Sequence, residues 1–174
     1  MVVRARGVWS IIENSTRRKK AQMAVLRKML ETGVRVDKDG RYYLGDIEIP
    51  DISISRALGI DRRVVRQTAD LILSDPDLEN IFTRLIPVAF FRDVSPYLGF
   101  TVIVVTSQPE RPGVISEVTS IIAKHRLTIR QALADDPELV EEPKLTMVIE
   151  GEIPPDVITE LQNMKVVKSL TIVK

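Results

Sequence analysis

Residues 100–174 switch between two hydrophobic periodicities, and this alternation limits the folds open to the chain more than any other feature. "FTVIVVTS" is an apolar run of strand length, whereas the apolar residues of "GVISEVTSIIAKH" recur at helical spacing. "TIRQALA" and "LTMVIEG" then alternate as strands do, "DVITELQNM" repeats the helical spacing, and "VVKSLTIVK" alternates again. The predicted order is βαββαβ. Because each helix has a single apolar face, both are expected to cover the same side of a four-stranded antiparallel sheet.

Residues 1–94 predict a helical region that contains one β-hairpin. Ser15 or Thr16 is expected to cap a helix that Gly33 ends. "VRVDKDGRYYLGDIEIP" predicts the hairpin, with a two-residue turn at Asp39-Gly40. "ISISRALG" predicts a short helix, after which a left-handed Gly59 leads into a second helix capped by Asp61. Two helices joined in this way make up a helix-turn-helix, whose second helix enters the major groove of DNA.

The second helix, residues 61–73, separates apolar from polar side chains. At about 100° per residue, one half of its surface is apolar and the other carries Arg62, Arg63, Arg66, Gln67 and Asp70. We expect Arg62, Arg63 and Gln67 to meet base edges, since Arg reads guanine and Gln reads adenine. Phosphate contacts are expected from Arg66 and from the basic run Arg17, Arg18, Lys19 and Lys20. The alternatives are an ordinary solvated helix face and a dimerisation module.

The charge distribution favours DNA binding over these two alternatives. The net charge is only +1, but residues 1–99 hold 17 Lys and Arg against 13 Asp and Glu, whereas residues 100–174 hold 8 against 11. The basic excess therefore lies in the half of the chain that contains the arginine-rich helix, as expected of a nucleic-acid-binding region.

The composition argues against an enzyme. The chain has no cysteine and one histidine, so disulfides and Cys-based metal sites are excluded. His125 follows a predicted helix, where a cation suits the helix dipole. The acidic cluster at 135–143 lies between prolines with no histidine nearby, and is interpreted as a solvated turn. We therefore expect no catalytic residues, no metal ligands and no cofactor.

A loop after the first predicted strand of the βαββαβ unit is the candidate ligand site. In "SQPERPGVISEV", Pro112 suits the opening turn of a helix, and Gly113 leaves the adjacent backbone amides uncovered. A helix N-terminus of this kind can bind a carboxylate. Arg111 would add a bidentate contact, and Arg130 or Gln131 on the following strand are further candidate partners. The alternative is that the Pro-Gly pair simply starts the helix tightly against its sheet.

Two sequence stretches carry a resemblance to a known family. "PERPGVISEVTSIIAKHRLTI", within a βαββαβ unit, resembles the ACT domain, a small-molecule-sensing module of amino-acid metabolism with a ferredoxin-like fold. Together with "GDIEIPDISISRALGIDRRVVRQT", nearly the whole chain resembles the archaeal ACT-containing predicted regulators of amino-acid metabolism. The resemblance implies ligand contacts at Arg111, Gly113, Val114 and Ile115, largely through backbone groups. It also implies pairing of subunits, with ligands at their interface.

The sequence thus predicts an α+β protein with a helix-turn-helix domain at 1–94 and a ferredoxin-like ACT domain at 95–174. The expected function is a regulator that binds double-stranded DNA through residues 54–73 and an amino acid or similar effector at the ACT domain. A homodimer or higher homo-oligomer is expected. The alternative is a regulatory subunit of a biosynthetic enzyme that does not bind DNA.

Other classes fit less well. An RNA-recognition motif shares the βαββαβ order but needs aromatic residues on its central strands, and these strands have none. No segment approaches the roughly 18 apolar residues of a membrane span, and the N-terminus lacks the apolar core of a signal peptide. A cytoplasmic location without a membrane partner is therefore expected.

Overall fold

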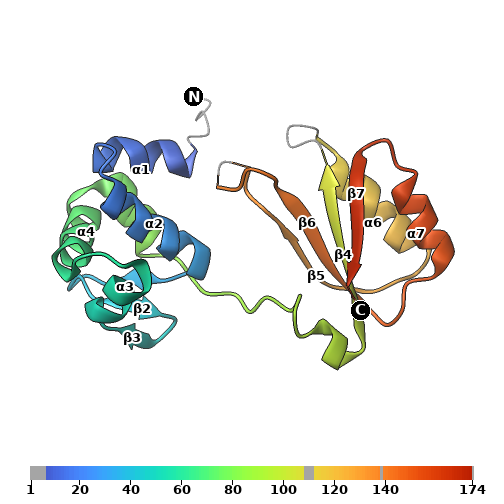
Figure 1. The fold of residues 1–174 in the computed structure, drawn as a ribbon, viewed down its shortest axis with the longest axis horizontal. Coiled ribbons are helices and arrows are strands. Elements are labelled where there is room, and N and C mark those ends of the chain that lie inside the picture. Colours follow the sequence, from blue (N-terminus) through green and yellow to red (C-terminus); the bar gives the residue numbers. More distant parts are fainter. Residues whose placement is uncertain (1–6, 108–111, 138, 174) are drawn as a thin grey trace. The chain divides into compact units, whose positions relative to one another are not determined.

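The computed structural model describes residues 7–107, 112–137 and 139–173, and the chain divides into two compact units at Ala89/Phe90 (Figure 1). The fold class is α+β: the described residues form seven α-helices, a three-stranded sheet and a four-stranded sheet. The second unit begins five residues before the expected boundary at 94/95. The reason is that the backbone N–H of Phe91 donates to Gln131 Oε1 at 2.9 Å, which joins this segment to the second sheet.

The first unit packs five helices with a small antiparallel sheet. The helices are α1 (Val8–Thr16), α2 (Lys20–Thr32), α3 (Asp51–Leu58), α4 (Arg62–Ser74) and α5 (Pro76–Phe82), and the strands are β1 (Arg35–Val36), β2 (Tyr42–Leu44) and β3 (Ile47–Ile49). The strand order is β1-β2-β3. Val25, Met29, Val65, Ile72 and Phe82 lie in its core, each with at most 1% of its surface exposed. The apolar side of α4 therefore packs in the core, and the opposite side lies on the surface.

The basic run at 17–20 joins two helices, and the expected N-cap at Ser15 or Thr16 is wrong. Both residues end α1: Thr16 Oγ1 donates to the Ile12 carbonyl at 2.7 Å, and α2 begins only after Lys19. Arg17 and Arg18 have φ values of 48° and 59°. This left-handed conformation costs a residue other than glycine about 1–2 kcal/mol.

Gly33 ends α2 as predicted, with φ of 72°. A side chain at this position would have no space, because a Cβ atom would lie 2.5 Å from the Ile86 carbonyl oxygen. The end of α2 therefore packs directly on the backbone of the segment that follows α5.

The hairpin predicted at 34–49 is present, but its turn is longer than the expected two residues. Asp37 N–H donates to the Arg41 carbonyl at 2.9 Å, which leaves a three-residue loop with Gly40 at φ 74°. The Asp37 carboxylate accepts the N–H groups of Asp39 and Arg41, both at 2.9 Å. This internal acceptor stabilises the longer loop in place of a two-residue turn. A second turn at Gly45 then adds β3, which the sequence analysis did not separate from β2.

The second unit has the βαββαβ order expected from the sequence. Its elements are the 3-10 helix η1 (Ser95–Leu98), β4 (Phe100–Ser107), α6 (Val114–Lys124), β5 (Ile129–Ala134), β6 (Lys144–Glu150), α7 (Pro155–Gln162) and β7 (Val167–Val173). The strand order is β5-β6-β4-β7, and neighbouring strands are antiparallel. Both α6 and α7 cover one face of the sheet (Figure 1), where Ile103, Met147, Val118 and Leu161 are fully buried.

The segment before β4 is attached to the second unit by polar contacts, and its aromatic side chains are partly or largely exposed. Tyr97 is 90% exposed, and Phe90 and Phe91 are 42% and 37% exposed. Ser95, which is fully buried, donates its hydroxyl to the Phe91 carbonyl at 2.6 Å. Among the helices of the described residues, none is long and apolar enough to cross a membrane.

Candidate nucleic-acid interface and effector pocket

The turn between α3 and α4 sets the direction of α4. Gly59 adopts φ 63°, and the Ser55 hydroxyl, which is almost fully buried, donates to the Ile60 carbonyl at 2.7 Å. Asp61 then caps α4 by accepting the N–H of Arg63 at 2.7 Å. The predicted roles of Gly59 and Asp61 are therefore confirmed, and the first turn of α4 has one defined conformation.

The predicted division of α4 into two faces is confirmed. Val65, Thr68, Ala69 and Ile72 are fully buried, whereas the opposite face is exposed and consists of Arg62, Arg63, Arg66, Gln67 and Asp70. The three arginines border a hollow of about 560 Å³ together with Asp51 and Asp61. Arg62 Nε lies 3.9 Å from the Asp51 carboxylate. Four of the five exposed side chains thus carry hydrogen-bond donors that water can reach.

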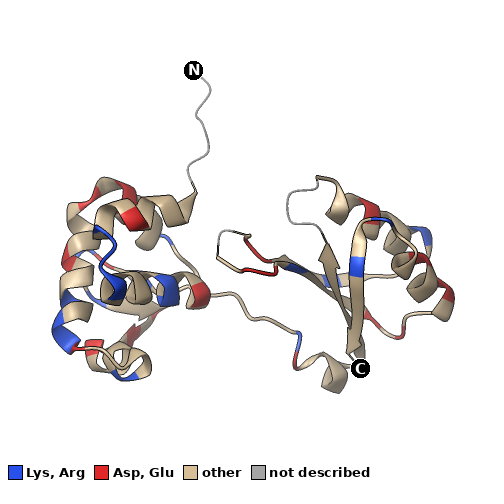
Figure 2. Cartoon of the chain, turned by 45° about the horizontal axis from the view of Figure 1, so that its top comes forward, with Lys and Arg blue, Asp and Glu red and all other residues tan. Residues whose placement is uncertain are grey.

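The segment between α1 and α2 brings further positive charge to α4. Arg17 and Lys19 border a second hollow, of about 590 Å³, with Gln67, Asp70 and Ser74 of α4. In Figure 2 the basic residues are blue, and both the α1–α2 connection and the start of α4 carry them. The α1–α2 connection, which precedes α4 by about 45 residues in sequence, therefore borders the exposed face of α4.

The other two members of the basic run lie differently. Arg18 is exposed and approaches Glu13 at 3.8 Å. Lys20 borders a separate small hollow with Trp9 and Arg27, where the Arg27 guanidinium stacks 4.8 Å from the Trp9 ring centre. The structure therefore does not bring Lys20 to the hollow beside α4.

Arg41 is a cationic neighbour of α4 that sequence reasoning missed. It borders a hollow of about 230 Å³ with Arg62 and Arg66, which also contains Glu48 and Asp51. Glu48, 3.7 Å away, raises the pKa of the Arg41 guanidinium. No local sequence pattern indicates this proximity, because it depends on the packing of the hairpin on α4, where the Tyr42 hydroxyl donates to the Val65 carbonyl at 2.7 Å.

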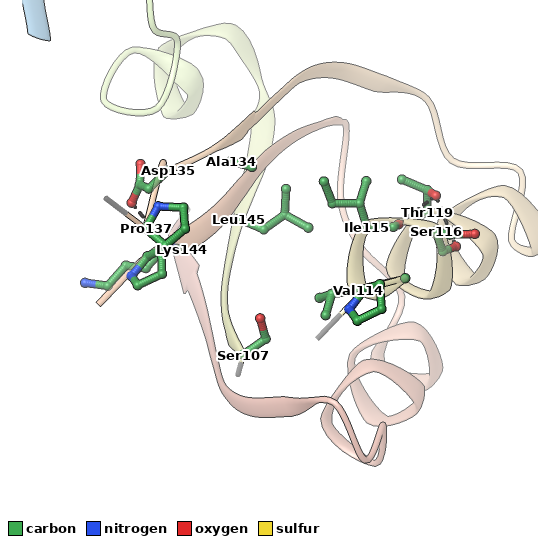
Figure 3. Close-up of a pocket in the computed structure, with 13 residues that line it drawn as sticks. Ser107, Val114, Ile115, Ser116, Thr119, Ala134, Asp135, Pro137, Lys144 and Leu145 are labelled. Carbon is green, nitrogen blue, oxygen red and sulfur yellow. Dashed lines mark hydrogen bonds between the residues drawn. The ribbon is translucent and has the colours of Figure 1, made fainter. Parts of the chain in front are cut away.

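The second unit contains a pocket of about 680 Å³ between the start of α6 and the end of the β5–β6 hairpin (Figure 3). Figure 3 shows Ile115, Ser116 and Thr119 on the helix side and Asp135, Pro137 and Lys144 on the hairpin side, with Leu145 between them. The lining is Ser107, Pro112, Gly113, Val114, Ile115, Ser116, Thr119, Ala134, Asp135, Pro137, Pro143, Lys144 and Leu145.

Four of the seven predicted ligand residues line this pocket: Pro112, Gly113, Val114 and Ile115. Arg111 lies outside the described residues. Arg130 and Gln131, the other two predicted ligand residues, do not line this pocket. Arg130 lies 3.6 Å from the Glu150 carboxylate and 5.5 Å from the Phe100 ring centre. A register shift in β5 at this point puts Gln131 opposite Val148, where it binds the Phe91 N–H.

The start of α6 supplies backbone amides to the pocket wall. Gly113 adopts φ 92°, and the first helical hydrogen bond runs from the Glu117 N–H to the Gly113 carbonyl at 2.9 Å. The amides of Val114–Ser116 precede that bond and so have no acceptor within the helix. Across the pocket, the Asp135 carboxylate accepts the Lys144 N–H at 3.1 Å. The two walls therefore offer hydrogen-bond donors on one side and a carboxylate on the other.

The hairpin side of the pocket was missed because sequence reasoning stopped at the loop before α6. Strand pairing gives the signal: Thr106 of β4 lies opposite Lys144 of β6, and Val105 lies opposite Leu145. In an antiparallel pair the end of one strand meets the start of the other, so the βαββαβ order alone brings residues 144–145 beside the loop.

The only histidine stabilises the contact between α6 and α7. His125 ends α6, and its Nε2 lies 3.1 Å from Glu160 Oε1 while its Nδ1 lies 3.5 Å from the Asp156 carboxylate. Lys124 donates to the same Glu160 carboxylate at 2.9 Å. Hydrogen bonds from Lys124 and then His125 lower the pKa of Glu160. Over the part of the chain that the structure describes, no cluster of three or more His, Asp or Glu side chains is arranged to hold a metal ion.

Comparisons with known proteins leave the family open. No protein-family model matches this chain, and no curated protein matches it. The crystal structure of PH0061 aligns at 12% identity over 89% of this chain and 90% of its own, with a TM-score of 0.31. The crystal structure of MtbAldR aligns at 11% identity over 89% and 91%, with a TM-score of 0.26. TM-scores this low carry no argument about fold or function.

Proposed function

We propose that the chain is a ligand-responsive DNA-binding regulator of amino-acid metabolism, with a helix-turn-helix at 54–73 and an ACT-like sensing unit. One observation carries the DNA-binding half: Arg17 and Lys19 lie beside the same helix that exposes Arg62, Arg63 and Arg66. A solvated helix face requires no second cationic segment next to it. A phosphate-binding surface gains affinity from each added cation.

The exposed residues of α4 suit the reading of base edges. Arg62, Arg63 and Gln67 occupy its first two turns, the part of a recognition helix that enters the major groove. Arg donates two hydrogen bonds to guanine, and Gln exchanges two with adenine. Arg62 lies 3.9 Å from Asp51 and its side chain is 67% exposed, so this ion pair is weak. Arg62 can therefore exchange Asp51 for a DNA partner at little cost.

The pocket of the second unit suits a zwitterion. Amides at the start of α6 would bind a carboxylate, and Asp135 on the opposite wall would attract an ammonium group. Leu145 and Ile115 would contact the apolar part of the ligand. An amino acid has these three features, and the pocket volume of about 680 Å³ lies within the usual range for small-molecule sites.

Regulation requires that the ligand prefer one arrangement of a homodimer over another, because equal affinity for both would shift nothing. Two copies of α4 would then contact half-sites about 34 Å apart, one turn of the double helix. The ligand would change DNA affinity by changing the spacing of the two helices.

DNA binding is tested by fluorescence anisotropy of duplex DNA over a range of salt concentrations. The wild type is expected to bind with a slope of several units in a plot of log affinity against log salt, about −0.9 for each phosphate contact. An Arg62/Arg63/Arg66→Ala variant should lose part of that slope. Failure of both proteins to bind at ~50 mM salt would mean that the arginine face is only solvated surface.

The sensing half is tested by thermal unfolding in the presence of each amino acid. A ligand at about 100 times its Kd should add ~2.7 kcal/mol, a shift of several degrees for a chain of this length. The absence of a shift with every amino acid at millimolar concentration would remove the sensing claim.

A regulatory subunit that does not bind DNA is the second candidate, and one surface favours it. Val94, Tyr97 and Leu98 are 46%, 90% and 52% exposed, which is unusual for apolar side chains so close in sequence and marks an interaction surface. Co-purification of this chain with a biosynthetic enzyme, together with a lack of DNA binding, would support this function over the first.

A further inference from the structure

We propose that the β1–β2 hairpin forms a second flank of the DNA-binding surface, so that the two sides of α4 contact phosphates on opposite strands of one duplex. This inference rests on the proposed function. It adds a role for Lys38 and Arg41, and it predicts that the two flanks of α4 contact different strands.

The hairpin loop packs directly against α4. A Cβ atom built on Gly40 would lie 3.7 Å from both Ala69 Cβ and Leu73 Cδ1, and 3.9 Å from Arg66 Cζ. One residue beyond Arg41, the buried Tyr42 hydroxyl donates to the Val65 carbonyl at 2.7 Å. The loop therefore has a defined position relative to α4, and Lys38 and Arg41 are exposed on it.

The hairpin and the α1–α2 connection border different sides of α4. The hairpin loop approaches Arg66, Ala69 and Leu73, which follow one another at spacings of three and four residues and so form one row. The α1–α2 connection borders Gln67, Asp70 and Ser74, a row one residue further around the helix. Because successive residues are about 100° apart, the exposed arginines lie between two segments, and each segment exposes cations: Lys38 and Arg41 on one, Arg17 and Lys19 on the other.

This arrangement matches a duplex. A helix in the major groove lies between two phosphate backbones, one from each strand, across a groove about 12 Å wide. Cations on both flanks of α4 can each meet a different backbone. A single strand offers only one line of phosphates and would leave one flank without a partner.

The hairpin also carries the acidic residues Asp37, Asp39 and Glu48, so the proposed contact depends on where Lys38 and Arg41 lie and not on the net charge of the hairpin. The Asp37 carboxylate is occupied by two backbone N–H groups of its own loop. Glu48 pairs with Arg41 at 3.7 Å, but both side chains are more than half exposed, so the pair is weak and a phosphate can replace the carboxylate. The Arg41 guanidinium is charged at any ordinary pH, and Glu48, followed by Tyr43 and Asp39, raises its pKa further.

The experiment measures the salt dependence of duplex binding for two double variants, Lys38/Arg41→Ala and Arg17/Lys19→Ala. Each should reduce the slope by about 1.8, the value for two phosphate contacts. Lys28/Arg84→Ala is the matched control, because both cations are in the same unit but lie on neither the hairpin nor the α1–α2 connection. It should keep the wild-type slope. Thermal unfolding of each variant checks that the fold is retained.

Strand assignment comes from duplexes in which methylphosphonates replace the phosphates of one half-site only, on one strand at a time, because in a two-fold dimer each whole strand meets both flanks. The neutral replacements should weaken wild-type binding on either strand. Each double variant should be insensitive to them on one strand. That strand should differ between the two variants. The inference is overturned if Lys38/Arg41→Ala keeps the full slope, or if both variants become insensitive on the same strand.

The same measurements separate this inference from the proposed function. Loss of slope in Arg62/Arg63/Arg66→Ala but not in Lys38/Arg41→Ala would leave DNA binding intact and remove only the hairpin contact. A wild type that fails to bind duplex at ~50 mM salt would remove both.

Discussion

The Tyr42 hydroxyl donates a 2.7 Å hydrogen bond to the backbone carbonyl of Val65, and this bond ties the β1–β2 hairpin to the middle of α4. Tyr42 is fully buried, and burial raises the pKa of its phenol, so the donor stays protonated at any ordinary pH. The buried Tyr42 hydroxyl therefore helps to hold the hairpin on α4, together with the packing of Gly40 against Ala69 and Leu73.

Replacement of Tyr42 by Phe should lower the free energy of unfolding by about 1 kcal/mol, the usual net value of a buried hydrogen bond. The ring keeps its apolar contacts, so the loss reports the hydroxyl alone. Urea denaturation measures it. Tyr43→Phe, on the partly exposed neighbour, is the control and should change stability less; equal losses would contradict the special role of Tyr42.

Replacement of Arg17 by Gly should stabilise the first unit by roughly 0.5–1 kcal/mol, because glycine adopts φ 48° without strain. It should also weaken DNA binding, since a cation is lost beside α4. Arg126→Gly is the matched control: Arg126 has φ 55° but lies in the second unit. It should bring a similar stabilisation in thermal unfolding and leave DNA affinity unchanged. A fall in DNA affinity for both variants would point to a general effect of net charge.

Asp75→Ala should cost about 1 kcal/mol, since Asp75 caps α5 by accepting the N–H groups of Asp77 and Leu78. A hydrogen bond from Ser15, followed by these backbone bonds, lowers the pKa of Asp75. A lowered pKa means that the carboxylate contributes stability above its unfolded pKa of about 3.9, and that this contribution is lost as pH falls through the folded pKa. Chemical denaturation between pH 2 and 7 should therefore show the wild type and Asp75→Ala converging at the acid end.

Glu160→Gln should lower the melting temperature at pH 7 more than at pH 3. Lys124 and His125 lower the pKa of Glu160, so its stabilising effect is present above the unfolded pKa and disappears as pH falls through the folded value. Thermal unfolding at the two pH values measures the difference. A Lys124→Met background provides the control: there the effect of Glu160→Gln at pH 7 should shrink, because its first partner is gone.

Gly113→Ala should destabilise the second unit by about 1 kcal/mol and remove any thermal shift with amino acids. The φ of 92° is strained for alanine, so the first turn of α6 must change and its amides leave their positions in the pocket wall. Ser120→Ala, on an exposed position of the same helix that does not line the pocket, should keep the ligand-induced shift. Unchanged ligand response in Gly113→Ala would argue against the α6 amides as ligand contacts.

The element order of the second unit could be predicted from the sequence because its apolar residues recur at long, regular spacings. The segment "FTVIVVTS", for example, coincides with β4. The same periodicity correctly divided α4 into a buried and an exposed face. Strong local patterns of this kind reflect burial on one side, and burial is what the final packing enforces.

The failures come from interactions that a local pattern does not contain. Thr16 was interpreted as an N-cap, but its hydroxyl binds the preceding turn of α1, a helix that the sequence analysis did not expect. Gln131 was placed in the ligand site, but a register shift in β5 turns it to the segment before β4. Arg41 was overlooked because its proximity to α4 depends on the tertiary contact made by Tyr42. The Thr16 error thus comes from an unexpected helix, the Gln131 error from a one-residue change in register, and the Arg41 error from a partner far along the chain.

Gly33 also bears on how substitution tolerance in this chain is interpreted. A Cβ atom there would meet the Ile86 backbone at 2.5 Å, so even alanine is too large, although the position touches no proposed DNA or ligand contact. In a saturation mutagenesis experiment, Gly33 would behave as intolerant as a catalytic residue while contributing nothing to recognition. The intolerance of Gly33 to substitution therefore reports the lack of space between its own backbone and that of Ile86. Only positions such as Arg41 or Arg63, where the side chain is exposed and the fold accepts change, can report on binding.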